Sequence, residues 1–341
     1  MPDKLIIIDR RGDLRVRVGP DQHADECIEF LVCSRSLARA SLVFDRMLYG
    51  SFSDSIHNQP NNASSNKSPW TVRLVEEKPV PFEIFLNITH ANVSKVPHIL
   101  SVDSLYDLAV LTDYYDATTL LIPWIEGWVA SVKEVTRDAN TIMPKMLWIS
   151  WEFGRQTEFM TIARRLLMET KTPWPTESFE VDGVLAPPYI VERINAVRLQ
   201  TIHDLLDVVY KVVEVLTVVD EGPRWCRYAN SPGHHRCESM LLGSMTFCLA
   251  RAGLWPLPVA EDVKLSLLEI YHIMTSLIIH DIGETSEKPR EDHQECNPGP
   301  KILRKVQQVM SAIPSLLTEY HISRLDKQAE KLQPGVFNPI K

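Results

Sequence analysis

The spacing of the apolar residues changes along this chain, and this change limits its possible folds more than any other feature. Over about the first 130 residues, strand patterns alternate with helix patterns. The segment LRVRV at 14–18, for example, alternates apolar and cationic residues as a half-buried strand does. Beyond about residue 135, apolar residues recur every three or four positions, which is typical of helices. The sequence therefore predicts an α+β region followed by an all-α region.

The composition indicates a globular protein with enough apolar residues for a sizeable core. The chain has 341 residues, of which 45% are hydrophobic and 23% are charged. This length favours two domains. The formal net charge of −8 argues against a protein that holds nucleic acid mainly through its phosphates. No sequence window has the eighteen apolar residues of a membrane span, so we expect neither nucleic acid nor membrane as a direct partner.

The first residues and the cysteines together indicate a reducing compartment. The apolar run at 5–8 is too short for the core of a signal peptide. Six cysteines in a chain without a secretory signal are expected to be reduced thiols. We therefore expect a cytoplasmic or nuclear location, or both.

The segment SLARASLVFDRMLYG at 36–50 interrupts its apolar stripe at Ser41. Two short helices that meet at this residue would explain the interruption, because a serine can cap the second helix. Phe44, Met47 and Leu48 would then face the core, and Gly50 would end the helix. Strands are predicted at 5–8, 14–18, 28–32 and 70–74, the third of them antiparallel to the second. The pattern thus predicts a small sheet with a helical layer on one side.

A longer helical pattern occupies residues 188–219. Its apolar stripe fits either a coiled-coil seam or the buried side of a long helix in a bundle. Further helices are predicted at 142–169, 237–252, 262–280 and 300–331.

Residues 5–132 resemble a BTB/POZ domain of the type common in filamentous-fungal proteins. The resemblance is carried by Gly12-Asp13 at the start of a strand, by Leu37-Ala38-x-x-Ser41-x-x-Phe44, and by His90, Tyr115-Asp116 and Pro123-Trp124. It implies a BTB/POZ-like domain over 1–133, a small sheet flanked by helices. Residues 134–341 would form the helical C-terminal domain of similar fungal proteins.

The resemblance implies protein–protein interaction without catalysis. BTB domains dimerise, bind partner proteins or present clients to cullin-3 ubiquitin ligases. We therefore expect a non-enzymatic interaction module, with cullin-3 and a client protein as partners. The alternative is a self-associating scaffold or transcription-associated factor that forms a homodimer or larger oligomer.

The residues that could bind a partner follow from matching this sequence to the family's motifs. Asp13 matches the acidic residue of the family's charged dimer groove, but Ser34 stands where a cation is expected. Phe52 and Asp54 match an apolar-x-acidic triplet that cullin-3 binders often carry after the second helix. The alternative is a loop aromatic that folds back on its own domain. Tyr49 would add apolar contact area.

The helical half contains a group of metal-ligand residues but no catalytic signature. Cys226, Cys237, His293 and Cys296 would complete a tetrahedral structural zinc site between two loops. Free cysteines and solvated histidines are the alternative. The sequence has no G-x-S-x-G, H-E-x-x-H or phosphate-binding glycine motif, so no catalytic residue is assigned. An unrecognised hydrolase or zinc enzyme in the C-terminal half is a third hypothesis.

Overall fold

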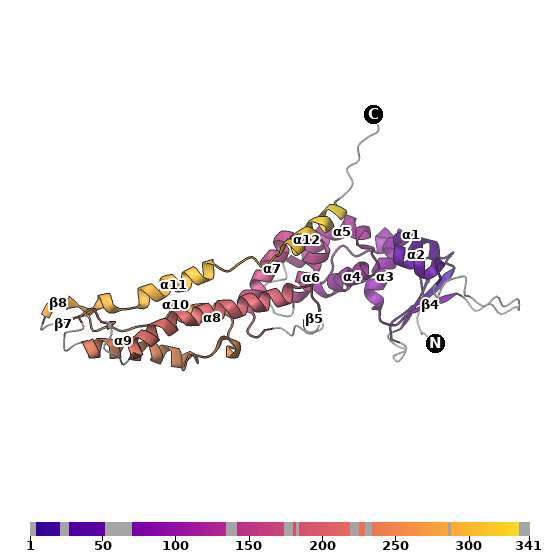
Figure 1. Ribbon diagram of the computed structural model, residues 1–341. Helices are drawn as coiled ribbons and strands as arrows, with labels where there is room; N and C mark the ends of the chain where they lie inside the picture. The colour runs from indigo at the N-terminus through magenta and orange to yellow at the C-terminus, as the bar shows by residue number, and fades with distance from the viewer. Residues whose placement is uncertain are drawn as a thin grey trace, which may run out of the picture. The chain divides into compact units, whose positions relative to one another are not determined.

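The computed structural model divides the chain into two compact units (Figure 1). The first unit comprises Met1–Ile162, Glu180–Pro187 and Leu317–Lys341, and the second comprises Ala163–Phe179 and Pro188–Leu316. The structure describes residues 5–20, 27–51, 70–133, 142–173, 180–181, 184–218, 225–228, 234–285 and 288–333.

A four-stranded mixed sheet begins the first unit. Its strands are β1 (Leu5–Ile7), β2 (Leu14–Val18), β3 (Ile28–Val32) and β4 (Thr71–Leu74). They lie in the order β1-β3-β2-β4, with β2 and β3 antiparallel and the two outer strands parallel to their neighbours. The predicted strands and the antiparallel pairing of the second and third are therefore confirmed.

The inner face of the sheet packs on helices through aromatic rings. The first four helices are α1 (Ser34–Ala40), α2 (Leu42–Tyr49), α3 (Pro79–Thr89) and α4 (Val102–Tyr114). Phe30 of β3 lies 6.2 Å from Phe82 of α3, measured between ring centroids. Phe44 of α2 stacks on Tyr115 at 4.3 Å. These rings are almost completely buried, so they form the core between the sheet and the helical layer.

The two short helices meet at Ser41, as the sequence predicts. The Ser41 hydroxyl accepts a hydrogen bond from the backbone N–H of Phe44 at 3.2 Å and donates one to the carbonyl of Tyr115 at 2.6 Å. Phe44 and Leu48 are buried, whereas Met47 is only half-buried. A β-carbon at Gly50 would lie 2.3 Å from the carbonyl oxygen of Arg46, so this position excludes side chains.

Three further helices complete the first unit: α5 (Ile122–Lys133), α6 (Met143–Glu152) and α12 (Glu319–Lys331). α6 packs on α4, and α12 is held on α6 by polar contacts. The side-chain amide of Gln328 donates to the Glu152 carbonyl oxygen at 2.8 Å and to its Oε1 at 3.1 Å. The C-terminal helix thus belongs to the same compact unit as the sheet.

The second unit is built around the 28-residue helix α8 (Ile190–Thr217). Its other elements are α9 (His234–Arg251), α10 (Leu267–Thr275), the 3-10 helix η6 (His293–Cys296) and α11 (Gly299–Ser311), while α7 (Gln156–Glu169) spans the division between the units. The apolar stripe of α8 is buried in contact with α10 and α11. Of the two predicted possibilities, a coiled-coil seam and the buried side of a helix in a bundle, this contact favours the bundle. Arg198 is also buried and donates to the carbonyls of Lys171 and Leu265.

The prediction that everything after residue 133 is all-α is wrong in part, since two short hairpins occur there. They pair β5 (Glu180–Val181) with β6 (Val184–Leu185), and β7 (Glu284–Thr285) with β8 (Lys288–Asp292). Strands this short do not show the alternation by which strands are recognised, and β8 reads KPRED. The helix predicted at 300–331 is two helices, because Pro314 follows the end of α11.

The boundaries of the two compact units differ from the single domain boundary that the sequence predicts between residues 133 and 134. The first unit includes α6 and α12, which come after that boundary. No helix in the described part of the chain combines the length and the apolar character that a bilayer crossing requires.

Glu152 is a buried carboxyl group at the junction of α4, α6 and α12. It is 1% exposed, accepts a hydrogen bond from the Thr118 hydroxyl at 2.5 Å and lies 3.7 Å from Arg324. Burial, with the neighbouring carboxylate of Asp113 as the next cause, raises the pKa of Glu152 to about 8. The folded protein therefore holds a proton here that the unfolded chain releases near pH 4.5.

We expect the stability of the first unit to fall as the pH rises towards 8, because Glu152 loses its proton while it is buried. The contribution is fully present below about pH 4.5, and each tenfold change in proton affinity is worth about 1.4 kcal/mol. A Glu152→Gln variant can still accept from Thr118 and does not ionise. Its melting temperature should exceed that of the wild type by an amount that grows from pH 5.5 to pH 8.5.

The matched control is Glu330→Gln, which changes an exposed residue on α12. Differential scanning fluorimetry over this pH range measures the effect. If the curves of melting temperature against pH for the wild type and Glu152→Gln run parallel, the proposed protonation is wrong.

Candidate metal centre

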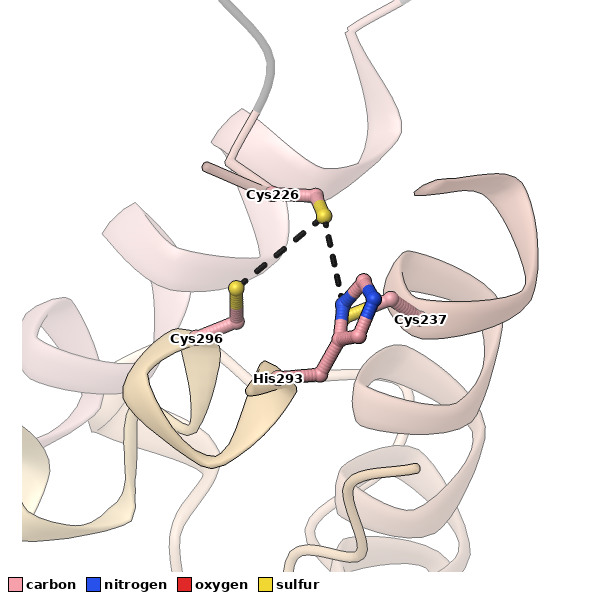
Figure 2. A group of neighbouring side chains, drawn as sticks. All are labelled: Cys226, Cys237, His293 and Cys296. Carbon is pink, nitrogen blue, oxygen red and sulfur yellow. Dashed lines mark hydrogen bonds between the residues drawn. The ribbon is translucent and has the colours of Figure 1, made fainter. Parts of the chain in front are cut away.

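Four buried side chains from three segments of the second unit converge on one point (Figure 2). Cys226 lies in the segment 225–228, Cys237 on the first turn of α9, and His293 and Cys296 at the two ends of η6. Their ligand atoms all lie within 4.8 Å of one another. These are the four residues that the sequence predicts as ligands. The fold brings Cys226 close to His293 and Cys296, which lie 67 and 70 positions further along the chain.

The spacing of these atoms matches a tetrahedral zinc ion. With Zn–S bonds of about 2.3 Å and a Zn–N bond of about 2.0–2.1 Å, a tetrahedron separates two sulfurs by about 3.8 Å and a sulfur from the nitrogen by about 3.6 Å. The sulfurs of Cys226 and Cys296 are 4.0 Å apart, and Cys226 Sγ is 3.5 Å from His293 Nδ1. These two distances match such a site, so the cluster could hold a metal ion such as zinc.

The local backbone explains why these ligands face one another. η6 is a single turn, so residues three apart project to the same side. Asp292 caps this turn by accepting the backbone N–H of Gln294 at 2.9 Å. The Trp225 indole N–H donates to the Cys296 carbonyl at 2.6 Å, and Glu238 accepts the backbone N–H of Cys226 at 3.1 Å. Contacts around the ligands thus fix the segment 225–228 against both α9 and η6.

The protonation state of the thiols in the cluster depends on whether a cation is bound. Burial and the neighbouring thiols raise the pKa of the Cys237 thiol, and burial raises the pKa of the Cys226 thiol. A divalent cation reverses this preference because it stabilises thiolates directly.

The residues selected in the first unit are joined through Ser34. Asp13 accepts the backbone N–H of Ser34 at 2.8 Å and its hydroxyl at 2.7 Å. Because the Ser34 proton is directed to Asp13, the Tyr49 hydroxyl donates to Ser34 Oγ, at 2.6 Å. Asp13 is exposed, so it needs no buried cation. Phe52 and Asp54 lie outside the described residues.

Several contributors to the two sites were not assigned from the sequence. In the sequence, Ser34 is notable only because it occupies the position where the family motif has a cation. Its hydrogen bonds to both Asp13 and Tyr49 depend on α1 beginning at this residue. Glu238 directly follows the predicted ligand Cys237. This neighbouring position is the only feature of the sequence that indicates its contact with Cys226. Nothing in the local sequence indicates that Trp225 bonds to a carbonyl 71 residues away.

A groove of about 430 Å³ lies between α8 and α11, also in the second unit. Val197, Val309 and Ile313 form apolar parts of its lining, with Arg193 and Asp204 also among the lining residues. Apolar contact area with a few polar groups is typical of binding sites.

A scan against protein-family models found no match to this chain, and no curated protein matched it either.

We expect purified protein to contain about one zinc ion per chain, because four protein ligands give tight structural binding. Cys237→Ser and His293→Ala each remove one ligand and should lower the zinc content sharply. Inductively coupled plasma mass spectrometry measures the metal. The matched control is Cys248→Ser, which removes another thiol of α9 that lies outside the cluster.

A zinc content in the wild type well below one per chain contradicts the site. Equal zinc in Cys237→Ser and Cys248→Ser would show that the metal binds elsewhere. Removal of zinc with a chelator should also lower the melting temperature of the wild type and leave that of Cys237→Ser unchanged.

Proposed function

We propose that this chain is a non-enzymatic protein–protein interaction module and that its first unit is a BTB-like adaptor domain for a cullin-3 ubiquitin ligase. The proposal is carried by one observation: α2 ends at Tyr49, and the triplet Phe52-Ser53-Asp54 begins three residues further along the sequence. The triplet therefore follows the second helix, as the family resemblance requires. The four-stranded sheet packed against helices further supports this interpretation.

The mechanism of such an adaptor is proximity. The first unit would hold cullin-3 through Phe52, Asp54 and the neighbouring Tyr49, while the second unit holds a client protein. The groove between α8 and α11 offers the second unit apolar contact area together with charged groups. No residue of this chain would take part in a covalent step.

Self-association is the alternative function, and the edge of the sheet favours it. Among the described strands, β1 pairs only with β3, so its outer edge has no strand partner there. Open strand edges readily pair with a second chain. Asp13, in contrast, gives no support to dimerisation through a charged groove, since Ser34 takes the place of the expected cation.

We propose a structural role for the metal centre. Cys226, Cys237, His293 and Cys296 supply all four ligands of a tetrahedral ion, so none of the four positions is left for water or substrate. A catalytic zinc site would keep one position open. The bound ion would join the segment 225–228, α9 and η6.

We expect Phe52→Ala and Asp54→Ala to abolish co-purification with cullin-3, because each removes one half of the docking triplet. Affinity purification of the tagged full-length chain with tagged cullin-3, read by immunoblot, measures this. The control is Asp45→Ala, which removes an exposed carboxylate of α2.

Unchanged cullin-3 binding in both triplet variants would remove the proposed motif. If the wild type does not bind cullin-3 but elutes as a dimer in size-exclusion chromatography with light scattering, the scaffold function replaces the adaptor function.

A further inference from the structure

The sulfur of Cys226 is the middle member of a chain of contacts within the metal cluster (Figure 2). The Cys296 thiol donates a hydrogen bond to this sulfur across 4.0 Å, and Nδ1 of His293 lies 3.5 Å from it. A disulfide bond is about 2.05 Å long. The sulfurs of Cys226 and Cys296 therefore need to approach each other by only about 2 Å to form one.

Contacts on both sides of this pair of cysteines hold their backbone segments together. Trp225, directly before Cys226, donates its indole N–H to the carbonyl of Cys296 at 2.6 Å. Arg227, directly after Cys226, forms an ion pair with Glu295. Neither contact uses a metal-ligand side chain, so neither requires a bound ion. The fold thus keeps the two cysteines within reach of each other whether or not the cluster holds a metal.

The third thiol of the cluster is placed differently. Cys237 comes from α9, which contacts the segment 225–228 through the carboxylate of Glu238. Its sulfur lies within 4.8 Å of the other ligand atoms. The two contacts that bracket Cys226 and Cys296 therefore favour Cys296 over Cys237 as the partner of Cys226 in a disulfide.

Burial limits which oxidants can reach this pair. Cys226 is 1% exposed and Cys296 is 3% exposed, and the other two side chains of the cluster are buried as well. Thiol–disulfide exchange depends on access to the sulfur, so a bulky disulfide such as oxidised glutathione is excluded. Hydrogen peroxide is only slightly larger than water. The geometry therefore fits a small peroxide as the oxidant.

We propose that Cys226 and Cys296 are a site of reversible oxidation, at which a peroxide converts the two thiols into a disulfide and the metal ion leaves. In the loaded cluster both sulfurs are thiolates, which is the form of cysteine that acts as a nucleophile. The inference rests on the proposed structural role of the ion only for this starting state, since both thiols can also be oxidised when no ion is bound.

The reaction has two steps. The Cys226 sulfur attacks one oxygen of the peroxide, the O–O bond breaks, and the products are a sulfenic acid and hydroxide, which takes a proton from solvent. The Cys296 sulfur then attacks the Cys226 sulfur, the S–S bond forms, and the oxygen leaves as a second water. In total, two thiolates, one hydrogen peroxide and two protons give one disulfide and two waters. The sulfurs lose two electrons, which the peroxide oxygens gain.

Oxidation and metal binding exclude each other at this site. A disulfide sulfur is no longer a thiolate, so only Cys237 and His293 would remain as ligands of the ion. The disulfide would still join the segment 225–228 to η6, but α9 would lose the link that the ion provides. A peroxide would thus change how the start of α9 is held in the second unit.

The experiment uses the full-length chain, purified with its metal and then treated with hydrogen peroxide. Intact mass spectrometry should show the loss of two hydrogen atoms per chain, and digestion without reductant should give two peptides linked through Cys226 and Cys296. A chromogenic zinc indicator should record about one zinc ion released for each disulfide formed. Dithiothreitol should break the link and restore zinc binding. Oxidised glutathione should produce neither the link nor the release.

Variants assign the reaction to these two residues. Cys226→Ser and Cys296→Ser should each abolish the link. The matched control Cys248→Ser removes a thiol outside the cluster and should form the link as the wild type does. Cys237→Ser keeps both reacting thiols, so it should form the same link after prolonged exposure even though it has lost zinc.

The proposal is wrong if peroxide forms no link between Cys226 and Cys296 in the wild type, either loaded with zinc or treated with a chelator. A link through Cys237 or Cys248 instead, or oxidation only to sulfinic and sulfonic acids, would also overturn it. Protein that contains no zinc but forms the link would remove the structural ion and keep the oxidation site. Protein that contains zinc but never forms the link would show the reverse.

Discussion

The hydroxyl of Ser41 connects the two helical parts of the first unit, and the packing of its core depends on this connection. One oxygen both caps α2 and bonds to the carbonyl of Tyr115, 74 residues further along the chain. This fixes the corner between α1 and α2, so that Phe44 stacks on the ring of Tyr115 and contacts the rings of α3. The same corner positions Ser34 and Tyr49 beside Asp13. A single buried hydrogen-bonding group thus links the core to the polar group formed by Asp13, Ser34 and Tyr49.

Other buried polar groups have the same organising role. Arg198 joins two loops through their carbonyl oxygens, and Glu152 holds α12 on α6 through Gln328. Each group would destabilise the fold if it had no partner, so its position specifies which segments meet. The metal cluster differs because its four buried side chains all carry groups that can bind a metal ion. A bound zinc ion would join the three segments that supply them.

Each unit has polar groups whose charged state depends on their neighbours. In the second unit, burial disfavours the thiolate state of Cys226 and Cys237, and a bound cation would stabilise it. In the first unit, Arg17 lies opposite Glu29 of β3 and opposite Arg73 of β4. Departures from the local rules of stability often mark functional sites, because the missing contact is supplied by a ligand or partner. The metal cluster fits a protein whose function depends on what binds to it.

The sequence by itself determined the strands of the first sheet, the corner at Ser41 and the four residues of the candidate metal cluster. Strand alternation, a capping serine and the metal preferences of thiolate and imidazole are local properties, which explains why they could be predicted from residue type and spacing. Only the tertiary structure decided that Cys226 and His293 meet, that α12 packs in the first unit, and that Arg17 faces Arg73. These contacts join residues far apart in the chain, and they depend on packing and strand register that no short stretch of sequence specifies.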